Sequence, residues 1–247
     1  KLAQELAIKE EQAKAAVQLI DEGNTIPFIA RYRKEMTGAL NDETLRNLHE
    51  RLLYLRNLEE KKEQVINAIT DQGKMTEDLK KKILSAETLV AVDDLYRPYR
   101  PKKQTRATKA KEKGLEPLAN ILLLQKTTKS MEEEAAAFVN AEKGVANAKE
   151  AIAGAKDIIA EMIADMADYR KSIRNCTMKQ GSLVVKAKDE KAESVYEMYY
   201  DFREPLSKVT GYRVLAINRG EKEKFLTVKI EAPQDDILRY LEKKMIH

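Results

Sequence analysis

The sequence has one cysteine, no tryptophan and few residues that interrupt regular structure. A single cysteine, Cys176, excludes an internal disulfide framework and fits a reducing compartment. Nine glycines and six prolines in 247 residues favour long helices over a turn-rich β fold. No apolar run approaches the ~20 residues that a membrane-spanning helix needs, and no signal-peptide pattern is present. We expect a cytoplasmic protein without a membrane segment. Because the chain begins at Lys1 without methionine, we also expect it to be a trimmed piece.

Side chains that support catalysis or metal binding are scarce. The two histidines, His49 and His247, lie far apart, so with one cysteine they cannot form a zinc site of ordinary spacing. No glycine-rich phosphate-binding motif and no nucleophile elbow occurs. We expect His49 to be solvated and Cys176 to be a small buried residue. The sequence therefore predicts no catalytic residue, no metal ion and no cofactor.

One pair of neighbouring carboxylates, Asp93 and Asp94, needs separate consideration. Such a pair can hold magnesium, so a metal-dependent nuclease is one alternative. Adjacent residues on a helix diverge by about 100°, however, and one site rarely uses both. Arg97 and Arg100 follow closely, which favours ion pairs that brace a bend in the chain.

The amino-acid content favours a folded, mostly helical chain. Hydrophobic residues make up 43% and charged residues 35%, with a net charge of only +4. This apolar share supports a core of one large or two small domains. The total charge is too small to indicate nucleic-acid binding, so the local distribution of charge must decide.

Hydrophobic spacing predicts three elements in the first third of the chain. Residues 2–20 form an amphipathic pattern, and a short element covers residues 26–37. A long helix begins at Asn41 or Asp42 and ends at Gln72, about 30 residues in all. Its apolar residues recur at spacings of three and four, as Leu45, Leu48, Leu52, Leu55 and Leu58 show. A helix this long is expected to be a spine on which neighbouring helices pack.

Further helices are predicted from capping and breaking residues. Thr76 and Thr88 are suited to cap two short helices. Pro98 and Pro101 then break the helical pattern and favour extended backbone at the arginines before them. Later helices are expected at 105–113, 116–125, 131–140 and 146–169, with Gly114 ending the first of these.

The last part of the chain has a different pattern. Residues 182–188 and 224–230 carry β-branched residues in partial alternation, which predicts strands, and residues 191–202 read as a helix. Residues 213–218 also have a strand-like pattern. The fold class is therefore mainly α. We expect a multi-helix domain at 1–175 and a small α+β segment at 176–247.

Positive charge gathers in one stretch, residues 97–113. It contains eight basic residues and one acidic residue, Glu112, for a net charge of +7. Such a stretch can contact phosphates without reading sequence, and Tyr96 and Tyr99 offer stacking faces. The alternative is a solvated basic face. The candidate nucleic-acid-binding residues are Arg97, Arg100, Lys102, Lys103, Arg106 and Lys109.

A second, smaller basic cluster is Arg31-Tyr32-Arg33-Lys34. Its arginines have two equally supported roles. They can pair with carboxylates of the long helix, or they can meet a ligand.

Several segments together resemble the Tex family of bacterial transcription accessory factors. The words PFIARYRKEMTG at 27–38 and DLYRPYRPKKQTR at 94–106 match family signatures, and the leucine-rich long helix follows the first of them. Further matches follow in the family's order at 114–119, 138–145 and 215–220. One departure is visible, because Gly211-Tyr212-Arg213 stands where the family shows Ser-His-Arg. The last match suggests a helix that ends at Gly220 rather than a strand at 213–218.

The resemblance implies a non-catalytic N-terminal region with a helix-turn-helix-like unit. It also implies downstream RNase-H-like, helix-hairpin-helix and OB-fold domains outside these residues, with the OB-fold as the main nucleic-acid contact. The expected partners are nucleic acid, RNA favoured over DNA, and the transcription machinery. The competing hypothesis is a protein-interaction scaffold without nucleic-acid affinity, in which Arg31, Arg33, Arg97 and Arg100 brace the helices.

Overall fold

The computed structural model describes residues 1–246 as two compact units. The first unit is Lys1–Tyr96 and the second begins at Arg97. Helices α1 to α14 account for most of the described residues, and three short strands form one sheet. The predicted fold class, mainly α with a small α+β segment, is confirmed. The expected domain division at residue 175 stays a prediction.

Helix α5, Asp42–Asp71, is the longest element of the first unit. It begins where the sequence predicted, because the Asn41 side chain accepts a hydrogen bond from the Thr44 amide at 2.8 Å. Its 30 residues match the expected length. Apolar side chains at spacings of three and four are buried along it, namely Leu45, Leu48, Leu52, Leu58, Val65 and Ile69. The helix therefore has the spine role that its pattern indicated.

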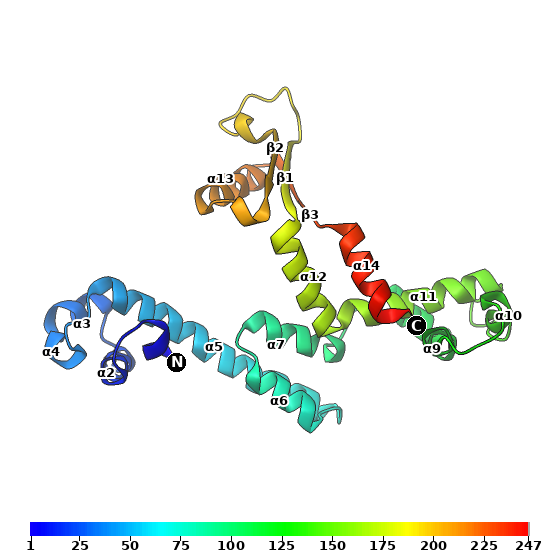
Figure 1. Cartoon of the computed structure of the whole chain (residues 1–247), viewed down its shortest axis with the longest axis horizontal. Coiled ribbons are helices and arrows are strands. Elements are labelled where there is room, and N and C mark those ends of the chain that lie inside the picture. The colour runs from blue at the N-terminus through cyan, green and yellow to red at the C-terminus, as the bar shows by residue number, and fades with distance from the viewer. Residues whose placement is uncertain (247) are drawn as a thin grey trace. The chain divides into compact units, whose positions relative to one another are not determined.

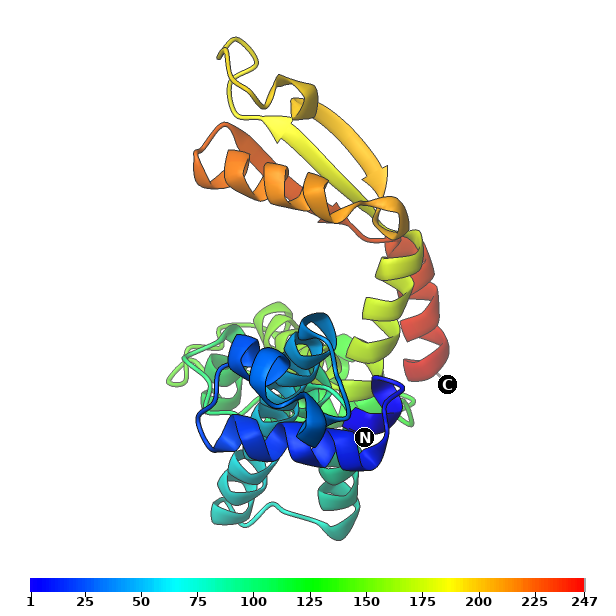
Figure 2. The ribbon, with the colours of Figure 1, turned by 90° about the vertical axis from the view of Figure 1, so that its left-hand side faces the viewer.

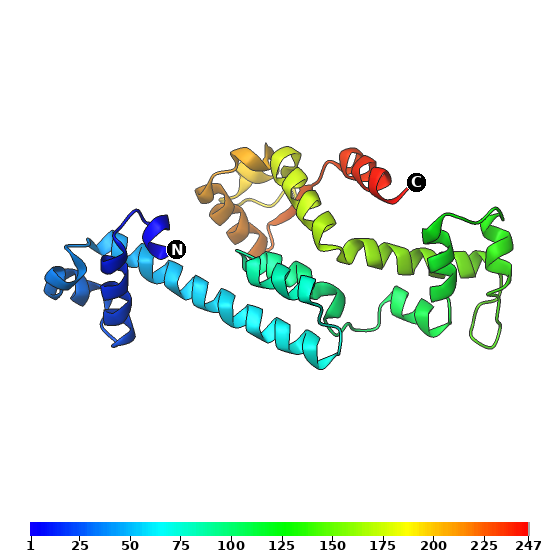
Figure 3. The ribbon, with the colours of Figure 1, turned by 60° about the horizontal axis from the view of Figure 1, so that its bottom comes forward.

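Three short helices pack on the first half of α5, and a fourth packs on two of these three. They are α1 (Leu2–Glu5), α2 (Glu10–Asp21), α3 (Ile26–Tyr32) and α4 (Lys34–Thr37), which gather at one end of α5 in Figure 3. The single helix expected at 2–20 is wrong. Ala7 has a φ of +52°, a left-handed conformation that no α-helix contains, so the chain turns between α1 and α2.

The corner that follows α4 is closed by a glycine. Gly38 has a φ of +60°, and its carbonyl accepts a hydrogen bond from Gln12 Nε2 at 2.9 Å. A Cβ at this position would lie 2.7 Å from the same nitrogen. The left-handed backbone angle favours glycine here, and the missing side chain leaves room for the Gln12 amide.

Helices α6 (Glu77–Ser85) and α7 (Leu89–Tyr96) fold back along the second half of α5 (Figure 3). Thr76 and Thr88 cap them as predicted, through bonds to the Leu79 and Ala91 amides. The buried Lys62 of α5 donates to the Leu84 carbonyl at 2.9 Å, which fixes the end of α6.

The helical part of the second unit differs in detail from the expected pattern. Arg97 lies in a 3-10 turn, η1 (Arg97–Tyr99), rather than in extended backbone. The helix expected at 146–169 is interrupted, because Met166 adopts an extended ψ of 116° between two helices. The helices are α8 (Arg106–Glu112), α9 (Glu116–Leu124), α10 (Met131–Ala136), α11 (Ala148–Asp165) and α12 (Ala167–Gln180). Gly114, with a φ of +82°, follows α8 as predicted.

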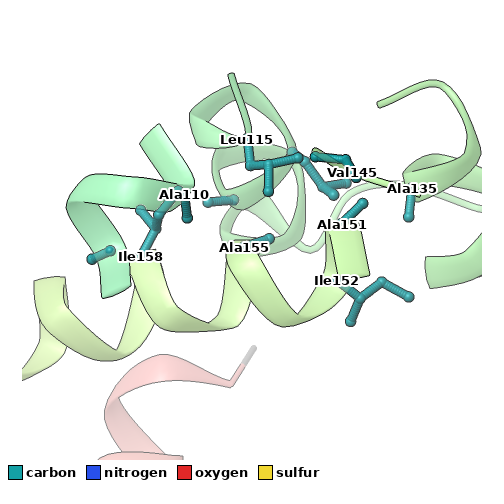
Figure 4. Close-up of a cluster of buried hydrophobic side chains, with 11 residues drawn as sticks. Ala110, Leu115, Ala135, Val145, Ala151, Ile152, Ala155 and Ile158 are labelled. Atoms are coloured by element: carbon teal, nitrogen blue, oxygen red, sulfur yellow. The ribbon is translucent and has the colours of Figure 1, made fainter. Parts of the chain in front are cut away.

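Alanines and one glycine let α8 and α11 pack closely. Ala110 of α8 and Ala155 of α11 are buried at the contact, beside Leu115 and Ile158 (Figure 4). A Cβ on Gly154 would lie 2.4 Å from Leu115 Cδ1. The absence of a side chain at Gly154 therefore sets how near the two helices can come.

The sheet has the order β2-β1-β3, with both pairs antiparallel. Strands β1 (Ser182–Ala187) and β3 (Leu226–Glu231) confirm the two predicted strands. The helix expected at 191–202 is wrong, since this region holds a short turn, η2 (Glu197–Tyr199), and the start of β2 (Asp201–Pro205).

One helix covers a single face of this sheet. Helix α13 (Gly211–Lys222) lies across the strands in Figure 2 and follows the short turn η3 (Leu206–Lys208). The helix suggested by the resemblance is confirmed, and the strand-like pattern at 213–218 was misleading. Ile217 of α13 is buried against Leu183, Val185 and Leu226.

The last helix, α14 (Gln234–Met245), lies beside α12 (Figure 1). The rings of Tyr240 and Tyr169 meet edge to face with centroids 6.0 Å apart. Tyr240 also donates to the Ser172 hydroxyl at 3.1 Å. These contacts join the chain after the sheet to the helix before it.

Candidate nucleic-acid interface

The predicted basic stretch is held on the second unit by a turn, a loop and a short helix. After η1 the chain runs irregularly until Thr105, whose hydroxyl accepts from the Thr108 amide at 3.0 Å and caps α8. Ala107 and Ala110 turn inward and are buried. The basic residues of α8 therefore point away from the core, as the spacing of the alanines requires.

Three carboxylates of α11 face this stretch. They are Asp157, Glu161 and Asp165, which we call the acidic stripe. Residues four apart lie on one face of a helix, so the three carboxylates form a row. The basic stretch crosses this row and pairs with each member.

Each ion pair joins residues that are distant in sequence. Arg97 Nε lies 2.9 Å from Asp165 Oδ1. Lys102 Nζ lies 2.8 Å from Glu161 Oε1 and also contacts Asp165. Arg106 Nε lies 3.5 Å from Asp157 Oδ1. Through these pairs, the acidic stripe neutralises three of the six candidate residues.

Partial burial and hydrogen bonding both act on the central pair. Burial would lower the pKa of Lys102, but hydrogen bonds to Asp165 and Glu161 outweigh it and raise that pKa. Burial would likewise raise the pKa of Glu161, but hydrogen bonds from Lys102 and Thr105 lower it. The Thr105 hydroxyl donates to Glu161 Oε2 at 2.7 Å. Both groups are therefore held in their charged forms.

The four ion pairs differ in solvent exposure. Only 9% of the Asp165 side chain is exposed, so Arg97 and Lys102 serve a carboxylate that water hardly reaches. Arg106 keeps 88% of its side chain exposed, and its pair is long. Exposed pairs contribute little, so Arg106 can leave Asp157 at small cost.

The remaining candidates, Arg100, Lys103 and Lys109, are exposed. Within residues 1–246, no ion pair or hydrogen bond engages the side chain of Lys103 or Lys109. Arg106 and Lys109 lie three residues apart on one face of α8, and Lys113, just past the end of the helix, continues this face. This face borders a shallow cavity of about 270 Å³ against Ala153 and Gly154 of α11.

Basic residues near the end of α8 have partners of their own. Lys111 pairs with Glu116 at 3.2 Å. Lys113 donates to the Gly144 carbonyl at 2.7 Å. The net charge that the stretch presents to solvent is thus smaller than the sequence count of +7.

The other residues considered from sequence are placed as follows. Asp94 is buried, and Asp93 lies 3.5 Å from Lys61. Cys176, expected to be buried, is half-buried. His49, expected to be solvated, is also half-buried. Among residues 1–246, no group of three or more metal-ligating side chains comes together, and no helix has the length and apolarity to cross a membrane.

Sequence reasoning found the basic stretch but missed the acidic stripe. The signal was present, because Asp157, Glu161 and Asp165 recur every four residues within an expected helix. What the sequence could not provide was their partner. The two segments meet only because α11 packs along α8.

The fold and this surface define a class: a helical module that carries a partly neutralised basic segment. Comparison with known families makes this class specific. The family model for the Tex-like protein N-terminal domain matches residues 1–70, and the Tex central region-like model matches residues 126–246. The chain belongs to the Tex family.

Relatives of known name are similar along nearly the whole chain. Uncharacterized protein YdcI of Bacillus subtilis is 45% identical over 99% of this chain and 34% of its own length. Transcriptional accessory protein Tex of Neisseria gonorrhoeae is 41% identical over 95% of this chain and 31% of its own length. S1 RNA-binding domain-containing protein 1 of Homo sapiens is 33% identical over 91% of this chain and 23% of its own length. The chain therefore spans about a third, or less, of these relatives.

Proposed function

We propose that this chain is a non-catalytic helical module of a transcription accessory protein, with an auxiliary nucleic-acid-binding surface on α8 and the loop before it. The residues that contact phosphates are Lys103, Lys109 and Arg106. The observation that carries this proposal is the exposure of Lys103 and Lys109 without a charged partner among the described residues. The names of two relatives, a transcriptional accessory protein and an S1 RNA-binding domain-containing protein, support it and favour RNA.

The ion pairs divide five of the six candidates into two groups. A phosphate that approached Arg97 or Lys102 would have to displace a carboxylate held in low exposure, which is costly. A phosphate that binds Lys103 or Lys109 displaces no carboxylate, and at Arg106 it displaces only an exposed one. We infer that Arg97 and Lys102 anchor the loop, and that Lys103, Arg106 and Lys109 bind phosphates without reading base sequence.

The test is binding of labelled single-stranded RNA and duplex DNA, measured by fluorescence anisotropy at two salt concentrations. Removing both lysines (Lys103→Ala with Lys109→Ala) should weaken RNA binding. The slope of log K against log salt should become shallower by about 1.4, since each lost phosphate contact removes about 0.7 for single strands.

A matched control removes two lysines elsewhere. Lys80 and Lys81 of α6 are exposed and have no ion-pair partner among the described residues. Changing both to Ala alters net charge equally and should leave affinity and slope nearly unchanged. Equal losses in the two double variants would show that only overall charge matters.

The acidic stripe supports a second candidate function, a protein-interaction scaffold without nucleic-acid affinity. In that case the basic stretch is a brace, and its charge is satisfied internally by α11. The same titration separates the two functions. If the chain binds neither RNA nor DNA at low salt, the nucleic-acid-binding function is rejected and the scaffold function is supported.

A further inference from the structure

The second basic cluster forms a distinct surface in the first unit. It lies where α3 ends and α4 begins, and it consists of Phe28, Arg31, Tyr32, Arg33 and Lys34, which we call the aromatic–basic corner. Tyr32 has 59% of its surface exposed, and its ring lies 5.3 Å from the Phe28 ring between centroids. The Arg33 guanidinium lies over the Phe28 ring, 5.0 Å from the ring centroid.

The cations of this corner are not neutralised within the described residues. No ion pair among residues 1–246 joins Arg31, Arg33 or Lys34 to a carboxylate, so the brace with the long helix that the sequence allowed is not formed. Three acidic residues on the surrounding helices have other basic partners. These pairs are Glu5 with Arg51 at 2.8 Å, Asp21 with Arg56 at 2.8 Å and Asp42 with Arg46 at 2.6 Å.

The frame that presents Tyr32 is well anchored. Ile29, one turn before it in α3, is fully buried, and so is Thr37 at the end of α4. The Thr37 hydroxyl donates to the Arg33 carbonyl at 3.2 Å, and Gln12 of α2 donates to the Thr37 carbonyl at the same distance. An exposed ring on an anchored frame loses little conformational entropy when it meets a ligand.

We propose that the aromatic–basic corner is a binding site for single-stranded nucleic acid, separate from the surface on α8. A base stacks on the exposed face of Tyr32, and Arg31 and Lys34 contact the neighbouring phosphates. Stacking platforms beside cationic side chains bind single strands in this way. A duplex fits poorly, because its bases are already stacked on each other. Arg33 stays over Phe28 and positions the aromatic pair.

The absence of tryptophan from the chain provides a direct test. The substitution Tyr32→Trp introduces a sole tryptophan at the proposed stacking position and keeps an aromatic face. Titration of the whole chain with a short oligouridine should quench its fluorescence in a saturable manner. Quenching reports the corner alone, whereas anisotropy reports binding anywhere on the chain, so failure here and failure of the α8 surface are distinguishable.

Charge variants then test the phosphate contacts. Adding Arg31→Ala and Lys34→Ala to the Tyr32→Trp chain should move the quenching curve to higher oligouridine concentration by at least about fivefold, and Lys80→Ala with Lys81→Ala should not move it. By anisotropy, Tyr32→Ala should cost at least about fivefold and Tyr32→Phe much less, because one stacked base contributes ~1–3 kcal/mol. Melting temperatures should be unchanged, since these side chains are exposed.

Two results would overturn the proposal. One is tryptophan emission that stays unchanged when oligouridine saturates the anisotropy signal. If that signal does not saturate, unchanged emission at the highest oligouridine concentration used has the same meaning. The other is equal quenching by poly-glutamate of matched charge, which has no bases to stack. That second result would assign the corner to an acidic protein partner.

Discussion

At the scale of single residues, Asp165 of α11 does most to hold the basic stretch in place. Its carboxylate accepts hydrogen bonds from Arg97 and Lys102, which precede α8 and lie more than sixty positions earlier in the chain. Asp157 occupies the same row of α11 but meets only the long, exposed pair of Arg106. The two carboxylates therefore form a natural comparison between a buried and an exposed ion pair.

We predict that Asp165→Asn destabilises the second unit by about 1–2 kcal/mol, because two cations lose their charged partner at a nearly buried position. Asp157→Asn should cost no more than about 0.5 kcal/mol, since its pair is exposed. Urea unfolding followed by circular dichroism measures both. Similar losses of unfolding free energy in the two variants would show that the buried pairs of Asp165 stabilise the fold no more than the exposed pair of Asp157.

Glu161 gives the loop a dependence on pH. Hydrogen bonds from Lys102 and Thr105 lower its pKa in the folded chain, despite partial burial. A carboxyl whose pKa is lowered by folding stabilises the fold above its ordinary value near 4.5, and this stability is lost as pH falls through the folded value. Stability should thus decline below about pH 4.5. In Glu161→Gln this part of the decline should be absent, and denaturant melts at pH 6 and at about pH 3.5 would show whether it is.

At the scale of elements, the close contact of α8 with α11 depends on Gly154. Gly154→Ala would place a Cβ 2.4 Å from Leu115 Cδ1 and 3.3 Å from Ala110 Cβ. Leu115 is buried and cannot swing aside, so overpacking at about 1–3 kcal/mol should exceed the gain of up to ~1 kcal/mol in helix propensity. We expect a lower melting temperature.

The matched control is Gly211→Ala at the start of α13. A Cβ there meets nothing within 4 Å, and the backbone angle is ordinary. This variant should be neutral or slightly stabilising. If both glycine variants behaved alike, close packing would not be the reason for Gly154.

Elements with local signals were predictable, and those defined by distant partners were not. The long helix α5 has its cap, its spacing and its end within 32 residues, so its bounds agree with the prediction. Strand β2 has a short, charged sequence, DFREP, and becomes a strand only by pairing with β1. The break at Ala7 was equally hidden, because alanine is a good helix former and its φ is imposed by packing.

At the scale of the whole molecule, the number of basic residues in a segment differs from the number that are available to a ligand. The sequence located the larger concentration of basic residues correctly at 97–113. It could not show that α11 would neutralise part of that charge, or that the smaller cluster at 31–34 would keep its charge. Each unit thus carries a basic surface, and the smaller cluster offers both free cations and an exposed ring.

The order of the sheet has a consequence for how the protein behaves at high concentration. With β1 in the centre, β2 and β3 are both edge strands, and edges invite pairing with other chains. The residues that alternate toward the uncovered face are mostly charged there, with Asp201 and Arg203 on one edge and Lys229 and Glu231 on the other. Two such edges could pair only by removing these charged side chains from water, so we expect the charges to oppose growth of the sheet beyond three strands.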